Sequence, residues 1–259
     1  MAKLIFFDVD GTLFRRDLGV PESTRNAIEK TIENGNIVML CTGRNASVMP
    51  DEVRKLPFSG GIFGCGTYVV SEGKVLLDAE SNPEDTKRIL DYLYLYKCPF
   101  YIENSDYYYL DRGYVPECFK ACDEALVTYY PEYYKEIDYS KGISKITGYP
   151  ETREHLLELK KALSPWFDVI IHEEYAYIEI TLKGYTKGTG VELLMNHLDI
   201  PREDTYGFGD SINDLPMLEA VGNPVVMGDA PEDMKRKYLV TDSIYDDGIA
   251  KAMKKLGLI

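Results

Sequence analysis

The sequence predicts an α/β protein in which a doubly wound parallel sheet is interrupted by an inserted α+β domain. Toward both ends of the chain, short apolar runs alternate with amphipathic stretches, as expected for parallel βαβ units. Sixteen of the 21 tyrosines lie between residues 83 and 182, so the middle differs in composition from both ends. At 259 residues, the chain also exceeds the usual size of one hydrophobic core. We therefore predict a core domain of residues 1–82 and 183–259 and an inserted domain of residues 83–182.

The N-terminal part contains short apolar runs separated by stretches of helical periodicity. We predict strands at 4–7, 37–40 and 62–63, helices at 21–34 and 45–56, and a hairpin over 67–77 that turns at Glu72 and Gly73. The strand and helix alternation resumes after residue 182. There we predict a helix at 187–197, a strand at 205–208, a helix at 214–221 and a strand at 224–227.

The middle segment follows a different order of elements. We predict helices at 83–97, 116–127 and 151–163, short strands within 100–110, and strands at 143–147, 168–172 and 176–181. This segment begins and ends at the boundaries of the core pattern, which is typical of a domain inserted into a loop.

Charge and composition argue against several kinds of partner. The formal net charge is −14, with 29 Lys and Arg against 43 Asp and Glu. Because an acidic surface repels phosphate backbones and anionic lipids, we expect neither nucleic acid nor a membrane as partner. No apolar run approaches the roughly 18 residues of a membrane span, and the run at 4–7 is too short for a signal peptide.

The five cysteines are an odd number, widely scattered, and contain no CxxC pair. Reduced thiols in the cytoplasm fit this pattern best. Cys118 and Cys122 are one helical turn apart, but without a second pair we expect apolar packing there rather than a metal site.

A pair of aspartates follows the first predicted strand, in the sequence DVDGTL at 8–13. In a doubly wound sheet, ligands bind beyond the carboxyl ends of the strands, so Asp8 and Asp10 would project into that site. One aspartate can act as a nucleophile, and the other can protonate a leaving oxygen and later activate water. Taken alone, most Asp-x-Asp pairs are polar turns with solvated or capping side chains.

Two weaker motifs follow the same logic. Thr42, Gly43 and Arg44 follow the second predicted strand, where a hydroxyl and backbone N–H groups at a helix N-terminus could hold phosphate oxygens. A plain turn with an N-cap is the alternative. Lys187 begins a predicted helix and could neutralise a transferring phosphoryl group, although an isolated lysine is usually a solvated surface charge.

A fourth motif, GDSIND at 209–214, follows the strand predicted at 205–208. Acidic groups at this position could complete the oxygen coordination of Mg²⁺, with Asp210 as the direct ligand. Alternatively, the segment is a helix N-terminus with Ser, Asn and Asp caps.

Together, these four motifs resemble those of the haloacid dehalogenase superfamily of phosphohydrolases, in the same chain order and at the same strand ends. The long α/β insert between the second and third motifs resembles the cap of the Cof-like branch, as does KITGYPETREHLL at 145–157. One departure lies at Gly64-Cys65-Gly66, where this branch often has Asn-Gly. We expect the loop to need only its glycines, although Cys65 could alter its contact with phosphate or cap.

The resemblance implies a role for each motif residue. It makes Asp8 the nucleophile and Asp10 the general acid and base, and it gives Mg²⁺ the Asp8 carboxylate, the Asp10 main-chain carbonyl and Asp210 as ligands. Phosphate binding and support of the site are implied for the residues Thr42, Gly43, Arg44, Lys187, Asn213 and Asp214. For Arg44, pairing with a core carboxylate is equally compatible with the sequence.

The second aspartate favours one reaction within the superfamily. Dehalogenases lack this acid, and the ion-pumping ATPases need membrane helices. The phosphomutases that these motifs resemble usually have a helical cap inserted between the first two motifs. In this chain only about thirty residues separate Asp10 from Thr42, and most of them are needed for one helix and one strand. We therefore expect hydrolysis of a small phosphorylated metabolite, a sugar phosphate or a cofactor phosphate. A phosphometabolite-binding or regulatory module without turnover, or a phosphomutase, is the alternative.

The tyrosines of the insert could stack on a substrate ring, but packing is the expected use.

Overall fold

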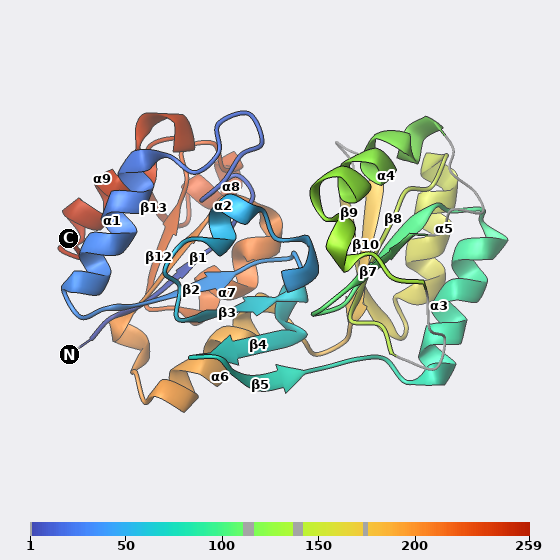
Figure 1. Cartoon of the computed structure of the whole chain (residues 1–259), viewed down its shortest axis with the longest axis horizontal. Helices are drawn as coiled ribbons and strands as arrows, with labels where there is room; N and C mark the ends of the chain where they lie inside the picture. Colours follow the sequence, from blue (N-terminus) through green and yellow to red (C-terminus); the bar gives the residue numbers. More distant parts are fainter. Residues whose placement is uncertain (1, 111–116, 137–141, 173–175) are drawn as a thin grey trace. The chain divides into compact units, whose positions relative to one another are not determined.

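The computed structural model describes residues 2–110, 117–136, 142–172 and 176–259 (Figure 1). The chain divides into two compact units. The first, here called the core unit, contains Met1–Gly43, Pro50–Leu77 and Thr186–Ile259. The second, the insert unit, contains Arg44–Met49 and Asp78–Tyr185.

This division differs from the predicted boundaries at three short segments, which all go with the insert unit: 44–49, 78–82 and 183–185. Hydrogen bonds account for the first two. Ser47 Oγ donates to the carbonyl oxygen of Asn104 at 2.8 Å, and Ser81 N donates to the carbonyl oxygen of Ile143 at 3.0 Å. Such partners are distant in the sequence, so local patterns do not reveal them.

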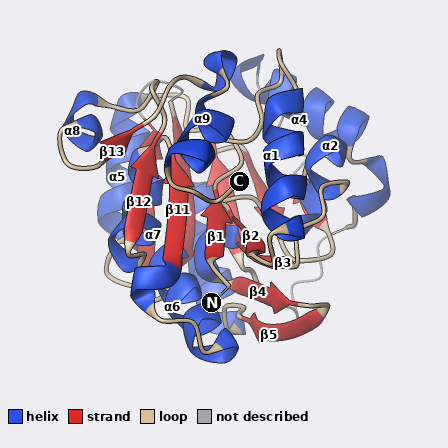
Figure 2. Ribbon diagram, turned by 90° about the vertical axis from the view of Figure 1, so that its left-hand side faces the viewer, coloured by secondary structure: helices blue, strands red, loops and turns tan. Residues whose placement is uncertain are grey.

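The core unit is built on an eight-stranded sheet of order β13-β12-β11-β1-β2-β3-β4-β5. Its six parallel strands are β1 (Leu4–Phe7), β2 (Ile37–Cys41), β3 (Gly60–Phe63), β11 (Thr205–Gly209), β12 (Asn223–Val226) and β13 (Leu239–Val240). β4 (Tyr68–Ser71) runs antiparallel to β3, and β5 (Lys74–Asp78) completes the hairpin predicted from the turn at Glu72 and Gly73. β1 and β11 lie side by side although nearly 200 residues separate them, as Figure 2 shows.

Helices cover both faces of this sheet, which confirms the doubly wound α/β class (Figure 2). α1 (Glu22–Glu33) and α9 (Gly248–Lys255) lie on one face. On the other, α6 (Lys187–Leu198) and α7 (Leu215–Ala220) pack against Leu4, Phe6 and Met39. Alternate residues of a strand point to opposite faces, so a strand covered on both sides is apolar throughout, as β1 is. The remaining short helical segments of the core unit are α2 (Asp51–Arg54), α8 (Glu232–Lys235) and 3-10 turns at Gly64–Gly66, Arg202–Asp204, Ile212–Asp214 and Ile244–Asp246. A further 3-10 turn at Ala46–Val48 belongs to the insert unit.

The helix predicted at 45–56 is wrong. The structure has a 3-10 turn at Ala46–Val48, an extended Met49 with ψ of 132°, and a separate short helix, α2. Pro50 is the reason, because proline has no N–H to donate and disfavours helical geometry in the residue before it.

The insert unit contains a five-stranded antiparallel sheet of order β7-β6-β8-β10-β9. Its elements are α3 (Pro83–Leu95), β6 (Phe100–Glu103), β7 (Tyr108–Leu110), α4 (Glu117–Tyr129), a 3-10 turn at Pro131–Tyr133, β8 (Lys145–Gly148), α5 (Arg153–Leu163), β9 (Phe167–His172) and β10 (Tyr177–Leu182). Side chains from one sheet face, such as Ile102, Ile146 and Ile180, form an apolar core with α3 and α5. The predicted α+β character of the insert is confirmed.

Several tyrosines of the insert are packing residues. Tyr108 is fully buried with Leu110 and Phe119, and its hydroxyl donates to the carbonyl oxygen of Leu126 at 3.1 Å. Tyr114, Tyr139, Tyr175 and the predicted helix start at Pro116 lie outside the described residues. Within the described part of the chain, no helix is both long enough and apolar enough to cross a membrane.

Candidate active site

Three neighbouring strands of the core sheet end at one edge, and a predicted site residue follows each of them. β1 is hydrogen-bonded between β11 and β2, with Phe7 aligned with Phe208 and with Leu40. The residues that follow these strands are Asp8, Asp210 and Thr42. Asp8 N continues the ladder by donating to the carbonyl oxygen of Phe208 at 2.9 Å. Parallel strands thus bring together residues that are far apart in the sequence.

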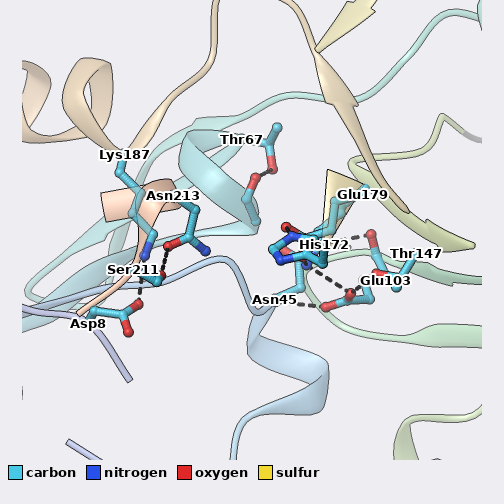
Figure 3. A network of polar contacts seen from close by, with 12 residues as sticks. Asp8, Asn45, Thr67, Glu103, Thr147, His172, Glu179, Lys187, Ser211 and Asn213 are labelled. Atoms are coloured by element: carbon cyan, nitrogen blue, oxygen red, sulfur yellow. Dashed lines mark hydrogen bonds and ion pairs between the residues drawn. The ribbon is translucent and has the colours of Figure 1, made fainter. Parts of the chain in front are cut away.

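Lys187 is the centre of the polar contacts at this edge. Its Nζ lies 2.6 Å from Asp8 Oδ1 and 2.5 Å from Asp214 Oδ1, and only 1% of its side chain is exposed. Figure 3 shows the lysine side chain directed toward Asp8. Thr186 caps the N-terminus of α6 through Thr189 and so fixes the first helical residue, Lys187. The lysine predicted from a weak motif is therefore a buried partner of two carboxylates.

Asp210 is held against the turn that follows β1. Thr12 Oγ1 donates to Asp210 Oδ1 at 2.8 Å. A Cβ at Gly11 would come within 2.3 Å of Asp210 Oδ2, and Gly11 has a φ of +85°. Both the left-handed backbone and the close approach require glycine at this position.

Asp214 organises the loop that carries the fourth motif. Its Oδ2 accepts hydrogen bonds from Asp210 N at 2.9 Å and from Ser211 N at 3.0 Å, while its Oδ1 contacts Lys187. Ser211 Oγ donates to Asn213 Oδ1 at 2.6 Å. Asp214 is fully buried, so it links the loop to the lysine rather than facing solvent.

The charges of this cluster do not balance. Asp8, Asp210 and Asp214 are three carboxylates, and Lys187 is the cation paired with two of them. Burial and the neighbouring Asp214 raise the pKa of Asp8 well above its usual range. The same two causes raise the pKa of Asp210 to about 7. Burial alone would lower the pKa of Lys187, but Asp214 and Asp8 raise it well above its usual value, so the lysine stays protonated.

The excess negative charge matches what a divalent cation needs. One oxygen from each of Asp8, Asp210 and Asp214 lies within 4.8 Å of the others. Carboxylate oxygens are the ligands that Mg²⁺ prefers, and a cation would offset the repulsion that raises these pKa values. The donor set therefore fits the metal expected from the sequence. Asp10 is exposed, and its expected contribution is its main-chain carbonyl rather than its carboxylate.

Thr42 lies buried at the end of β2. Its N donates to the carbonyl oxygen of Ile62 at 2.8 Å, and its own carbonyl oxygen accepts from Cys65 N at 3.2 Å. The segment that follows the motif is a 3-10 turn at Ala46–Val48, with Asn45 as its extended N-cap residue, and not the α-helix predicted there. Gly43 ends this segment of the core unit, whereas Arg44 belongs to the insert unit, where its guanidinium donates to the carbonyl oxygen of Val48 at 2.9 Å.

The loop at Gly64, Cys65 and Gly66 supports both Thr42 and the start of α6. All three residues have positive φ angles, of 55°, 59° and 108°. A Cβ at Gly66 would come within 2.2 Å of the carbonyl oxygen of Thr186. Thr67 Oγ1 closes the loop by donating to the carbonyl oxygen of Gly64 at 2.9 Å (Figure 3). Gly66 is thus needed for both conformation and space, Gly64 has the left-handed backbone that glycine favours, and Cys65 occupies a backbone region that few non-glycine residues adopt.

The sequence interpretation missed two groups of residues. Thr12 and Ser211 stand inside the motifs, and their hydroxyl side chains beside aspartates were a signal. The second group lies in the insert unit, where buried Glu103, Lys145 and Glu179 and half-buried His172 form a polar network. Figure 3 labels Glu103, Glu179 and His172 of this network. No local pattern marks these residues, because they come from four different strands.

The chain matches the family model of the haloacid dehalogenase-like hydrolases over residues 5–253. YkrA of Bacillus subtilis (strain 168), whose name marks it only provisionally as a phosphatase, is 30% identical, with 100% of this chain and 99% of that protein covered. The HMP-PP phosphatase of Yersinia enterocolitica is 27% identical, with 92% of this chain and 88% of that protein covered. Among solved structures, the subclass IIB sugar phosphatase BT4131 superposes with a TM-score of 0.83 at 26% identity and full coverage of both chains.

The chain therefore belongs to the haloacid dehalogenase-like hydrolase family. The resemblance predicted from the four motifs, to the Cof-like phosphatases of this superfamily with an α/β cap, is confirmed.

Proposed function

We propose that the protein is a Mg²⁺-dependent phosphatase that hydrolyses a small phosphorylated metabolite through a phosphoaspartate intermediate. The observation that carries the proposal is the buried contact of Lys187 with Asp8 and Asp214, beside Asp210, at the edge where β11, β1 and β2 end. The named relatives include a sugar phosphatase and an HMP-PP phosphatase, which supports a small substrate. The cytoplasmic location stays a prediction of the sequence.

Asp8 is the proposed nucleophile. Its carboxylate oxygen forms a bond to phosphorus while the bond from phosphorus to the ester oxygen breaks, and Asp10 gives its proton to that oxygen. Asp10 then accepts a proton from water, which attacks the phosphoaspartate and releases phosphate and the Asp8 carboxylate. Asp10 is exposed, so the leaving oxygen and then a water molecule can reach its carboxyl group in turn.

The remaining residues bind or orient. The Lys187 ammonium group, held by Asp8 and Asp214, offsets negative charge on the phosphoryl oxygens. Thr42, the backbone of Gly43, Asn213 and Arg44 are proposed to contact the phosphate. Asp214 keeps Lys187 in place and is a positioning residue.

Asp8, Asp210 and the Asp10 carbonyl would hold Mg²⁺, which supplies positive charge against the phosphate and the nucleophile. The proposed metal ligands are oxygen atoms of a cluster with surplus negative charge, which the metal would offset. Removal of the metal should therefore abolish activity.

The test is phosphate release from a panel of sugar phosphates, nucleotides, pyridoxal phosphate, HMP-PP and p-nitrophenyl phosphate, with Mg²⁺ or with EDTA. We expect release that requires Mg²⁺ and that Asp8→Asn abolishes without loss of fold. Turnover by folded Asp8→Asn close to that of the unchanged protein would contradict the nucleophile. Binding of a panel compound without any release would favour the alternative of a binding module.

A further inference from the structure

The two sheets that the structure describes have four edge strands: β5 and β13 in the core unit, and β7 and β9 in the insert unit. A strand at a sheet edge has backbone N–H and C=O groups that point away from the sheet and can pair with another chain. Short edge strands and covering segments usually prevent such pairing. The four edges differ in how well they are protected.

Two of the edges are protected against a further strand. β13 has only two residues. β7 has three, and the segment after α4 covers it: Tyr134 forms a bridge with Tyr108, and Lys135 N donates to the Tyr108 carbonyl oxygen at 3.1 Å. Neither strand is therefore both long enough and open enough to pair with another chain.

β5 is the outermost strand of the core sheet and has five residues, KVLLD at 74–78 (Figure 2). In the described part of the chain, β4 is its only hydrogen-bonded neighbour. Val75 is 49% exposed, and Leu76 and Leu77 are half-buried. β5 thus presents apolar side chains beside an unpaired backbone edge, a combination that favours the addition of another strand.

The two ends of β5 carry opposite charges. Lys74 and Asp78 are both exposed, and among residues 2–110, 117–136, 142–172 and 176–259 neither has an ion-pair partner. Burial and the neighbouring Asp106 raise the pKa of the Asp78 carboxyl group. A cation beside Asp78 would offset the repulsion from Asp106. Each end of the strand therefore has a charge that a partner could complement.

The sequence of β5 is complementary to itself when two copies lie antiparallel. Full overlap of the five residues puts Leu76 on a two-fold axis, opposite Leu76 of the second copy. Lys74 then lies opposite Asp78 of the second copy, and Val75 lies opposite its Leu77. Directly opposed side chains have Cβ atoms about 4.5–5.5 Å apart, which suits both an ion pair and an apolar contact. The register with the most backbone pairs is thus also the one that matches the charges.

β9, the fourth edge, lacks this complementarity. Full antiparallel overlap of its six residues would put Asp168 opposite Ile171 of a second copy, and Phe167 opposite its His172. An aspartate opposite an isoleucine loses solvation and gains no partner in return. Pairing between two copies is therefore favoured at β5 and not at β9.

We propose that β5 is an interface between two copies of this chain, whose eight-stranded core sheets join edge to edge into one continuous sheet. The occupant is a second copy because β5 itself supplies both charges and the apolar residues in the matching order. One strand buries less than the roughly 1,200 Å² of a standard interface, so the dimer is weak, with a dissociation constant of about 0.1 mM. This interface does not depend on the proposed phosphatase activity.

The first test is sedimentation equilibrium of the full chain from about 5 μM to about 1 mM, in about 0.15 M salt to screen the negative charge of each copy. We expect mostly monomers at the lower concentration and mostly dimers at the higher one. Hydrogen exchange of the β5 amides should become slower as the dimer forms. Monomers throughout this range, or dimers with unchanged exchange in β5, would overturn the proposal.

Two charge reversals test the register. Lys74→Asp or Asp78→Lys alone places like charges opposite each other at both ends of the interface, which should weaken dimerisation about tenfold. An equal mixture of the two variants should restore dimerisation, because one copy then carries two acidic residues at the paired positions and the other carries two basic ones. Both positions are exposed, so the variants should fold, which circular dichroism verifies.

The matched control for these reversals is Lys55→Asp. It makes the same change of charge at an exposed lysine after α2, and it should change the dissociation constant less than about twofold. Equal effects of Lys55→Asp and Lys74→Asp would show that the net charge of the chain matters and the β5 register does not. Failure of the mixture to restore dimers would likewise overturn the proposal.

Discussion

Lys187 Nζ lies 2.6 Å from Asp8 Oδ1, although 179 positions separate the two residues in the chain. The contact joins the N-terminus of α6 to the end of β1 and is fully buried. It pairs the proposed nucleophile with the charge that would offset the phosphoryl oxygens, so both groups are in place before a substrate binds.

Replacing Lys187 should abolish most of the catalytic activity while the protein still folds. We expect Lys187→Met to lower kcat at least 100-fold, because Asp8 and Asp214 lose their shared cation and the phosphate loses a positive partner. Lys187→Arg keeps the charge and should retain more activity. The measurement is steady-state phosphate release, with Lys251→Met as an exposed control that breaks an ion pair with Asp242. A kcat for folded Lys187→Met within a few-fold of the unchanged protein would contradict the proposed role.

Asp10→Asn should distinguish leaving groups. p-Nitrophenolate leaves without much protonation, so the variant should keep more of its activity on p-nitrophenyl phosphate than on a sugar phosphate. The measured quantity is the ratio of kcat/KM between variant and unchanged protein for each ester. Equal losses on the two esters would count against Asp10 as the general acid.

Gly66→Ala should disturb the loop that supports Thr42 and the start of α6. The added Cβ would come within 2.2 Å of the Thr186 carbonyl oxygen, in addition to strain at a φ of +108°. We expect a loss of about 2–4 kcal/mol in the free energy of unfolding, measured by urea denaturation. Gly73→Ala is the matched control, since it has a φ of +76° but open space around the new Cβ. Its loss should be about 1 kcal/mol; similar losses for the two variants would mean that backbone strain alone is responsible.

The lowered pKa of the Glu179 carboxyl group predicts that the stability of the protein depends on pH. Burial opposes ionisation of Glu179, but Lys145 and His172 lower its pKa from the usual 4.5 to about 2 in the folded protein. A lowered folded-state pKa gives stability that is present above about pH 4.5 and is lost as the pH falls toward 2. The stability difference between unchanged protein and Glu179→Gln should therefore shrink between pH 5 and pH 3, by about 1–2 kcal/mol. Urea denaturation across this range measures it, and a constant difference would contradict the charged buried pair.

Much of the fold follows from local patterns. The apolar run of β1 and the alternation of such runs with helical periodicity predicted the doubly wound sheet, and the tyrosine-rich middle segment predicted the insert. The prediction failed where proline overruled periodicity, in the helix expected at 45–56, because the turn at Pro50 breaks a pattern that otherwise favours a helix. The assignment of Arg44 to the insert unit had no local signal, because its guanidinium reaches the hydroxyl of Tyr130, 86 positions away, at 3.5 Å.

The sequence by itself determined the four motifs, their order and their positions after strands, because a strand followed by a polar turn is a local property of the chain. Only the tertiary structure decided that Lys187 is buried between Asp8 and Asp214 and that Asp210 lies against Gly11. It also decided that Glu103, Lys145 and Glu179 meet on one face of the insert sheet. These contacts join strands and helices that are distant in the chain. Burial and the neighbouring charges then shift the pKa values of the groups that meet there, which no local pattern in the sequence determines.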